Sequence, residues 1–306
     1  MKQFFYSNGK LLISGEYLVL DGAKALAFPT KFGQSLEVET IKEPSIFWKS
    51  LDEKGNVWLD IVIEISEIIS PQKNNTRKDI RETTQLISIL KEAQKLNPKF
   101  LTNNTGFVVT TKLDFPRNWG LGSSSTLINN IANWANVDAF LLLKNTFGGS
   151  GYDIASAQNN VPILYSIKEN KSHVEALSLN WKFTESLFFV HLNKKQDSRD
   201  AITSYQTQKA VASLYKDKIT QITTELINCS DLPEFEKLIT QHEKIISEII
   251  QQKTIKETLF KDYFGSIKSL GAWGGDFILA TGSKNNWNYF KDKGFTTILS
   301  FQEMIK

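Results

Sequence analysis

The chain has very little cysteine and no long apolar run. Cys229 is the only cysteine among 306 residues, which excludes an internal disulfide framework and a metal site built from several cysteines. No uninterrupted apolar stretch approaches the roughly 20 residues that a membrane-spanning helix needs. The N-terminus, from Met1 to Tyr6, lacks the apolar core and cleavage site of a signal peptide. We therefore expect a cytoplasmic protein with no membrane partner.

The sequence also lacks a large excess of charge of one sign. Its formal net charge is +3, and no window forms a strongly basic block, so we expect no nucleic-acid partner. Hydrophobic residues make up 41% and charged residues 23%, which is typical of a globular protein. This composition leaves open a small-molecule substrate and a homodimer as partners.

The pattern along the chain predicts an α+β protein in two parts. Strand-like runs come first (10–19, 35–40, 57–65 and 107–113), with a helix over 84–96 that places Leu86, Leu90 and Ala93 on one face. Helices follow at 127–134, at 152–158 and over most of 198–264, with a break at Asp231–Pro233. Further strands are predicted at 187–192 and, near the C-terminus, at 276–281 and 296–300. We place a domain boundary near residues 182–186, giving domains of 1–184 and 185–306.

A glycine- and serine-rich segment lies between a predicted strand and a predicted helix. Its residues are Gly120, Leu121, Gly122, Ser123, Ser124 and Ser125. Glycine lets backbone approach a ligand, serine hydroxyls bind phosphate or Mg²⁺, and the free N–H groups of a helix start attract an anion. A serine N-cap after a glycine turn is the alternative. Neither a P-loop nor a G-x-G-x-x-G fingerprint is present, which argues against a P-loop NTPase and a Rossmann dehydrogenase.

Four motifs in order resemble those of the GHMP kinases, the family of the galacto-, homoserine, mevalonate and phosphomevalonate kinases. Pro116-x-x-x-Gly120-Leu121-Gly122-Ser123-Ser124 resembles the family signature, and Asn8-Gly9-Lys10 with Gly15-Glu16-Tyr17 resembles its N-terminal motif. Gly149-Ser150-Gly151-Tyr152-Asp153 and Gly271-Ala272-Trp273-Gly274-Gly275-Asp276 resemble two further motifs. The resemblance covers nearly the whole chain. It implies an N-terminal α+β domain with a left-handed βαβ crossover and a ferredoxin-like C-terminal domain.

The resemblance also implies a role for each motif residue. Asp153 and Lys10 would be catalytic, with Asp153 taking or polarising the proton of the acceptor and Lys10 lying beside it. The Gly120–Ser125 loop would bind the phosphates of ATP, and Ser124 would also contact Mg²⁺. Glu16 would pair with Lys10 and face the substrate. The remaining substrate-side residues implied by the motifs are Gly271, Ala272, Gly274, Gly275, Lys195 and Ser198.

Some positions depart from the family pattern. Mevalonate kinases carry a Mg²⁺-binding glutamate about three helical turns before the catalytic aspartate, but Phe140–Lys144 contains no carboxylate. Asp138 is the nearest acid, so Ser124, Asp138, water and ATP would hold the metal. Trp273 replaces a glycine and is expected to narrow the substrate pocket. His173, His191 and His242 match no motif, so we expect structural or surface roles for them.

The predicted function is therefore transfer of the γ-phosphoryl group of ATP to an alcohol or phosphate, with mevalonate or phosphomevalonate as the acceptor. Two alternatives stay open at this point. One is a sugar or homoserine-type kinase of the same family. The other is a GHMP-fold binding protein that has lost catalysis, although the presence of both Lys10 and Asp153 argues against it.

Overall fold

The computed structural model describes residues 2–70, 81–102, 105–194, 205, 207–271, 273 and 275–306. These residues form two compact units, and the chain passes between them several times. Unit 1 contains the residues up to Gly9, Phe32–Arg117 and Gly122–Gln158. Unit 2 contains Lys10–Lys31, Asn118–Leu121 and Asn159–Lys306. The predicted boundary at 184/185 falls inside unit 2, because the strands just before it pair with the first half of β2 (Ala25–Ile41).

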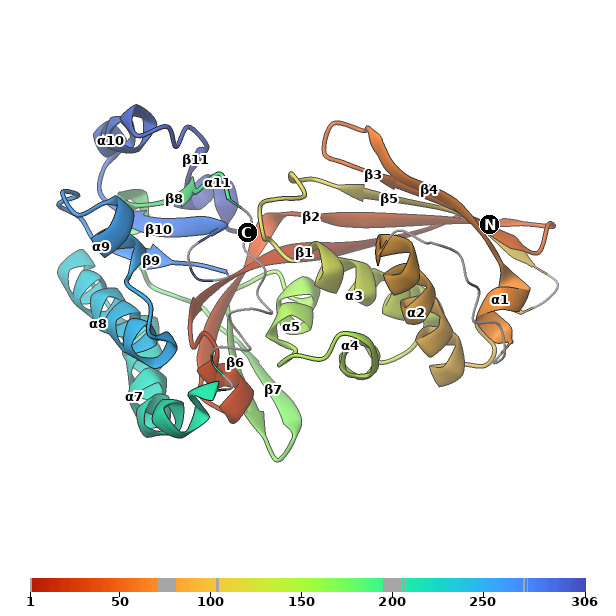
Figure 1. Ribbon diagram of the computed structural model, residues 1–306, viewed down its shortest axis with the longest axis horizontal. Helices are drawn as coiled ribbons and strands as arrows, with labels where there is room; N and C mark the ends of the chain where they lie inside the picture. The colour runs from red at the N-terminus through yellow and green to blue at the C-terminus, as the bar shows by residue number, and fades with distance from the viewer. Residues whose placement is uncertain are drawn as a thin grey trace. The chain divides into compact units, whose positions relative to one another are not determined.

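Unit 1 is a mixed sheet with helices packed against it (Figure 1). The strand order is β4-β3-β5-β2, with β1 beside β2, and β3 runs parallel to β5 while β2 is antiparallel to it. Besides β2, its strands are β1 (Lys2–Ser14), β3 (Ser45–Leu51), β4 (Val57–Glu64) and β5 (Gly106–Leu113). Its helices are α1 (Ile65–Ile69), α2 (Arg81–Leu96), α3 (Ser123–Ala135), α4 (Ala139–Thr146) and α5 (Tyr152–Gln158).

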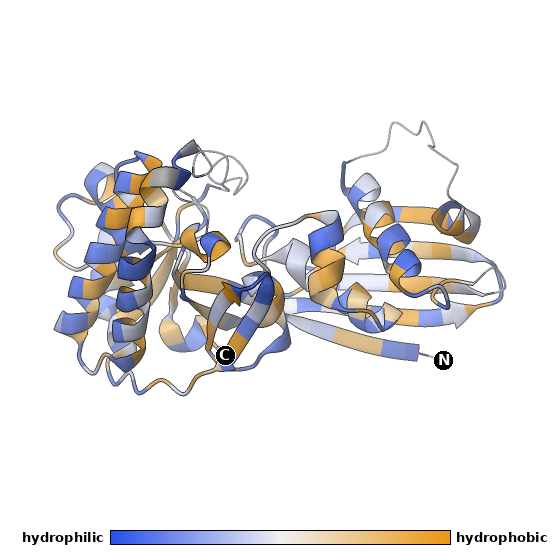
Figure 2. Cartoon of the chain, turned by 90° about the horizontal axis from the view of Figure 1, so that it is seen from below, coloured by the Kyte–Doolittle hydropathy of each residue, from blue (hydrophilic) through white to orange (hydrophobic). Residues whose placement is uncertain are grey.

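The helices of unit 1 cover the sheet with apolar faces. Leu86, Leu90 and Ala93 of α2 are buried, as the helical spacing predicts, and they pack in one core with Trp48 of β3 and Ile131 of α3. Figure 2 shows orange and blue alternating along the helices, as amphipathic helices covering a sheet do.

Unit 2 contains a four-stranded antiparallel sheet in the order β11-β8-β10-β9. Its strands are β8 (Leu187–His191), β9 (Ile267–Ser269), β10 (Phe277–Thr281) and β11 (Ile298–Ser300). The hairpin of β6 (Ile163–Lys168) and β7 (Lys171–Ala176) pairs instead with Ala25–Ala27. The helices are α7 (Lys209–Asn228), α8 (Leu232–Ile250), α9 (Ile255–Leu259), α10 (Trp287–Asp292) and α11 (Phe301–Met304), with short 3-10 turns at Leu18–Asp21, Thr184–Ser186 and Lys284–Asn286.

The fold confirms the predicted α+β class and corrects several boundaries. The break at Asp231–Pro233 is confirmed, since the Asp231 side chain accepts from Glu234 N and caps α8. The strand predicted over 10–19 was displaced, because β1 begins at Lys2 and ends at Ser14, before a turn at Gly15 and Tyr17. The β6–β7 hairpin was not predicted. The left-handed crossover and the ferredoxin-like arrangement stay predictions.

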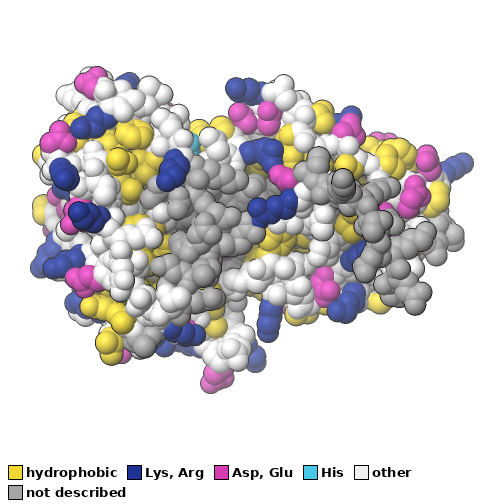
Figure 3. All heavy atoms as spheres, viewed as in Figure 1, with side chains coloured by type: hydrophobic (Ala, Val, Ile, Leu, Met, Phe, Trp, Pro, Cys, Tyr) yellow, Lys and Arg dark blue, Asp and Glu magenta, His cyan; other side chains and the backbone are white. Residues whose placement is uncertain are grey.

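The surface carries mixed charge. On the face in Figure 3, Lys and Arg side chains are interspersed with Asp and Glu over the described residues. Among the described helices, none combines the length and apolar character needed to cross a membrane.

Candidate active site

The glycine- and serine-rich loop has the backbone geometry expected of an anion site. Gly120 and Gly122 both have left-handed φ angles, 67° and 91°, which residues with a Cβ rarely adopt. Helix α3 starts at Ser123, and its first turn is closed by the bond from Thr126 N to Gly122 O at 3.0 Å. The N–H groups at the start of this 13-residue helix therefore precede its hydrogen-bonded turns and give a favourable place for phosphate.

The three serines of the loop differ in what they can reach. The Ser125 hydroxyl donates to Gly122 O at 2.8 Å, so it braces the loop itself. Ser124 is exposed and Ser123 half-buried, which leaves Ser124 available to phosphate or Mg²⁺. A hydroxyl beside free N–H groups at a helix N-terminus fits a phosphate chain with its metal.

A buried set of neutral polar side chains anchors α3. We call it the amide network, and its members are Ser7, Gln34, Thr126, Asn129, Asn130 and Gln158. Thr126 donates to Gln34 Oε1 at 2.7 Å, and Asn130 donates to Gln34 O at 2.8 Å. Ser7 donates to Asn130 Oδ1 at 2.7 Å, while Asn129 donates to Ser7 Oγ at 2.9 Å and accepts from Gln158 at 2.9 Å. The network thus joins α3 to β1, β2 and α5.

Sequence reasoning missed the amide network. The available signal was the adjacent pair Asn129-Asn130 inside an apolar helical run, at positions that the 3.6-residue period turns toward the sheet. Buried amides of this kind need partners, and here they find them.

Asp153 lies in the first turn of α5 and is partly exposed. Gly149 and Gly151 before it have left-handed φ angles of 101° and 90°, so the glycines of this motif are required by the turn. Helix α5 packs against α3, and the amide network holds its last residue. The geometry places the Asp153 motif in unit 1 beside the helix that follows the phosphate loop.

Lys10 lies in unit 2, against Gly120 and Leu121, the first half of the phosphate loop. It is a buried lysine of β1 whose backbone N donates to Leu121 O at 3.0 Å and whose Nζ lies 3.5 Å from Gly120 O. The N-terminal motif and the loop, 110 positions apart, are therefore in contact. Lys10 and Asp153 belong to different units, and their pairing stays a prediction.

Aromatic packing holds the segment before Gly120. His191 Nδ1 accepts from Asn193 N at 3.3 Å, which leaves Nε2 as the donor to Asn118 O at 3.2 Å. The Trp119 ring packs edge-on to Phe277 with centroids 5.3 Å apart. His191 thus has the structural role that we expected of it.

The Gly271–Asp276 loop meets the phosphate loop at one carboxyl group. A Cβ at Gly120 would lie 2.3 Å from the Asp276 carboxyl carbon, and one at Gly271 would lie 2.6 Å from Asp276 Oδ2. Asp276 is 6% exposed and itself has a left-handed φ of 54°. Both glycines are therefore needed to admit this side chain, and Gly275 beside it is buried.

Four predicted substrate residues, Ala272, Gly274, Lys195 and Ser198, lie outside the described residues. Trp273 is 3% exposed, and its indole N–H donates to Lys253 O at 3.4 Å. The ring therefore packs inside unit 2, and its predicted effect on a substrate pocket stays a prediction.

Glu16 is placed differently from our expectation. It is 4% exposed, and its carboxylate pairs with Lys268 Nζ and lies 3.1 Å from His242 Nε2. Burial raises the pKa of Glu16, but the Lys268 ammonium group, with the His242 ring beside it, outweighs burial and lowers that pKa to about 2. Lys10, the expected partner of Glu16, contacts Gly120 and Leu121. Lys268 is the lysine that pairs with Glu16 instead. Lys268 matches no motif and was missed, because its partner is 252 positions away.

Asp138 serves as a helix cap. Its side chain accepts from Phe140 N at 2.8 Å and Leu141 N at 3.3 Å at the start of α4. The structure thus gives Asp138 a capping role, and the role that we predicted for it in holding Mg²⁺ stays a prediction. Across the residues that the structure describes, no group of three or more His, Cys, Asp or Glu side chains is arranged to hold a metal ion.

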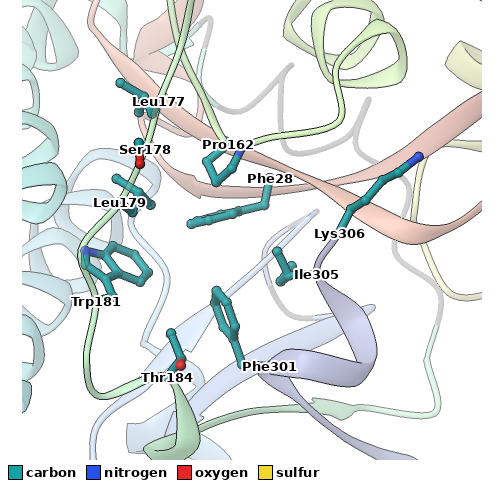
Figure 4. Close-up of a pocket in the computed structure, with 10 residues that line it drawn as sticks. All are labelled: Phe28, Pro162, Leu177, Ser178, Leu179, Trp181, Thr184, Phe301, Ile305 and Lys306. Carbon is teal, nitrogen blue, oxygen red and sulfur yellow. The ribbon is translucent and has the colours of Figure 1, made fainter.

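An open cavity of about 270 Å³ lies elsewhere in unit 2. Figure 4 shows the rings of Phe28, Trp181 and Phe301 around it, together with Ile305. None of its described lining residues belongs to the predicted site.

No protein-family model matches the chain, and no curated protein matches it. Several solved structures resemble it over nearly its full length. Mevalonate kinase from Methanococcus jannaschii superposes with a TM-score of 0.71 at 15% identity, covering 96% of this chain and 94% of that one. Lactococcus lactis galactokinase complexed with galactose gives 0.69 at 13% identity, covering 98% and 92%. Streptococcus pneumoniae phosphomevalonate kinase in complex with phosphomevalonate and AMPPNP gives 0.68 at 14% identity, covering 97% and 99%. This chain therefore has the fold of the GHMP kinases.

Proposed function

We propose that this chain is an ATP-dependent small-molecule kinase whose acceptor is mevalonate or phosphomevalonate. The observation that carries the proposal is the contact of Lys10 with Gly120 and Leu121, where left-handed glycines lead into the free N-terminus of α3. Lys10 thereby places an ammonium group beside the first half of the phosphate loop. The solved kinases of this fold support the same reading, since one of them holds AMPPNP.

Each residue has a role in the proposed reaction. The N–H groups at the start of α3 and the Ser124 hydroxyl bind the phosphates of ATP, and Lys10 neutralises charge beside Gly120. Asp153 accepts the proton of the acceptor hydroxyl as its oxygen bonds to the γ-phosphorus and the bond to the β-phosphate oxygen breaks. Mg²⁺, when bound, neutralises phosphate charge, and Ser124 is the residue that we expect to hold it. A homodimer and a cytoplasmic location stay predictions.

The direct test is a phosphotransfer screen. Purified protein with Mg·ATP is offered mevalonate, phosphomevalonate, galactose and homoserine, and ADP release is measured for each. We expect turnover with one of the first two and its loss in Asp153→Asn. Turnover with galactose or homoserine alone would move the protein to another acceptor class. Nucleotide binding without transfer to any acceptor would favour a binding protein, and the absence of nucleotide binding would overturn the proposal.

A further inference from the structure

Unit 2 buries four ionisable side chains in one place, which we call the charged cluster: Glu16, His242, Glu243 and Lys268. Lys268 of β9 is fully buried, and its Nζ pairs with Glu16 Oε1 and lies 3.3 Å from Glu243 Oε1. Glu243 Oε2 accepts from Ser269 Oγ at 3.0 Å. Two carboxylates therefore share one ammonium group. The pKa of Glu243 is raised by burial to about 7, while Glu16 keeps its charge beside Lys268.

The residue after Glu16 has an unusual backbone conformation. Tyr17 has φ 62° and ψ −51°, and the bond from Leu18 N to Glu16 O at 2.7 Å closes a three-residue turn around it. This γ-turn conformation is rare and strained for a residue with a bulky side chain. Strained residues of this kind persist only where the surrounding structure enforces them.

Three consecutive residues of this turn are each held by another segment of unit 2. Gly15 N donates to His242 Nε2 at 3.0 Å, and the Glu16 carboxylate is paired with Lys268. The Tyr17 ring stacks on Tyr205 with centroids 5.6 Å apart. Contacts with other segments therefore hold the turn in its conformation, and the Glu16–Lys268 ion pair is the middle one of the three.

His242 cannot take over the role of Lys268. A neutral imidazole Nε2 either accepts from Gly15 N or donates to Glu16, because one nitrogen cannot do both. Burial lowers the pKa of His242, and the Lys268 charge lowers it further, so the neutral ring is favoured. Accepting from Gly15 leaves Glu16 Oε2 without a hydrogen-bond partner among the described side chains and backbone. Among the described residues, Lys268 supplies the positive charge that compensates the Glu16 carboxylate.

Lys268 also connects two of the motif segments. On one side, Glu16 follows β1, the strand that contains Lys10. On the other, β9 ends at Ser269 and leads within two residues into the Gly271–Asp276 loop. One buried ammonium group therefore ties the end of the first motif to the start of the last. A role in stability alone would not require this charge, because well-packed apolar residues often replace buried ion pairs at no loss.

We infer that Lys268 is a positioning residue of the kinase site: through Glu16 it holds the strained Gly15–Leu18 turn, and along β9 it fixes the start of the Gly271–Asp276 loop. The inference rests on the proposed function, in which both segments belong to the acceptor side. Because Lys268 is fully buried, its effect on acceptor binding passes through these two segments.

The test compares four variants with the wild type. Lys268→Met removes the charge, Lys268→Arg keeps it, and the double variant Lys268→Met with Glu16→Gln removes both charges. Lys244→Met removes an exposed charge from α8 and is the matched control. We expect Lys268→Met to lower kcat/KM for the acceptor on the order of 10²-fold, as misplaced substrate contacts do, with the KM for ATP little changed. Lys268→Arg should recover part of the loss, and Lys244→Met should match the wild type.

Two readouts separate positioning from stability. The double variant should recover the melting temperature that Lys268→Met loses, yet keep the defect toward the acceptor. Recovery of both together would overturn the inference, as would a wild-type kcat/KM for the acceptor in Lys268→Met. Amide hydrogen exchange does not depend on activity: peptides covering 12–20 and 268–277 should exchange faster in Lys268→Met, while those covering 123–135 should not. Unchanged exchange in the first two would also overturn it. The wild type could also show no phosphotransfer while Lys268→Met still shows the faster exchange in these peptides. That result would refute the proposed function and leave the tie between the two segments standing.

Discussion

The amide network of unit 1 and the charged cluster of unit 2 are both buried, and they are stabilised in opposite ways. Every member of the amide network is neutral, and none of its buried atoms lacks a hydrogen-bond partner among the described residues. The charged cluster depends on charge balance, and two of its atoms, Glu16 Oε2 and His242 Nδ1, have no hydrogen-bond partner within that same set. The comparison indicates that the start of α3 is held by groups that do not titrate between pH 5 and pH 8, whereas the Gly15–Leu18 turn is held by a proton-dependent balance.

The largest expected effect concerns the one charged group of unit 1 that we place in the reaction, the Asp153 carboxylate. Asp153→Asn keeps the shape of the side chain and removes its charge. If the acceptor is an alcohol, turnover should fall about 10²–10⁴-fold, because a general base is lost, while nucleotide affinity stays unchanged. Asp231→Asn is the matched control, since asparagine also caps a helix well and should leave turnover intact. Near wild-type turnover in Asp153→Asn would remove Asp153 from the catalytic centre.

The next effect concerns the contact of Gly120 with Asp276. In Gly120→Ala the new methyl group meets the carboxyl carbon at 2.3 Å, in addition to the left-handed φ of 67°. Gly55→Ala has a similar φ of 85° but open space, so it isolates the backbone term of about 1–2 kcal/mol. Urea unfolding should show a clearly larger loss for Gly120→Ala, together with weaker ATP binding. Equal losses would mean that the loop shifts freely away from Asp276.

A smaller effect is expected from breaking the amide network. Asn130→Ala removes the acceptor of the Ser7 hydroxyl proton and the side-chain donor to the Gln34 carbonyl, which should lower the free energy of unfolding by about 1–3 kcal/mol. The loss should be the same at pH 5 and pH 8, because no member of the network titrates in that range. Urea titrations at the two pH values measure it. A loss that changes with pH would contradict the contrast between the two networks.

The smallest effect is a pH slope from the charged cluster. The pKa of Glu243 is raised by burial to about 7 from 4.5, so the folded state binds more protons than the unfolded state between these values. Its contribution to stability is therefore greatest below pH 4.5 and is lost as the pH rises to about 7. Glu243→Gln should flatten the fall in melting temperature over that range. An unaltered slope in this variant would assign the titration to another group.

The sequence predicted the features that depend on neighbouring residues. The left-handed glycines at 120 and 122, the helix after them and the cap at Asp231 are all set by a few adjacent positions. The hairpin of β6 and β7 escaped prediction because β7 is exposed along its whole length and carries no alternating pattern. Its turn uses positive φ angles at Glu169 and Asn170, a dipeptide that gives little turn signal.

The partners of the site residues were harder to predict, because they come from distant positions. Lys10 was expected beside Glu16, its close neighbour in sequence, whereas the structure pairs Glu16 with Lys268. The helical pattern places His242 within a predicted helical region, but the strand that contains Lys268 was not predicted. Periodicity also gives no information on which charges meet. The same limit applies to Asp138, which is the acid nearest in sequence to the missing motif glutamate and which the local backbone uses as a cap.

The 252 positions between Glu16 and Lys268 have a consequence for the chain as it is made. At synthesis rates of about 5–20 residues per second, the Glu16 carboxylate waits roughly 10–50 s on the ribosome before its partner has been added. Burial of that carboxylate before then would leave its charge uncompensated, so the nascent chain keeps it hydrated. Closure of the Gly15–Leu18 turn therefore follows the synthesis of β9, and the first motif to leave the ribosome is among the last to reach its native conformation.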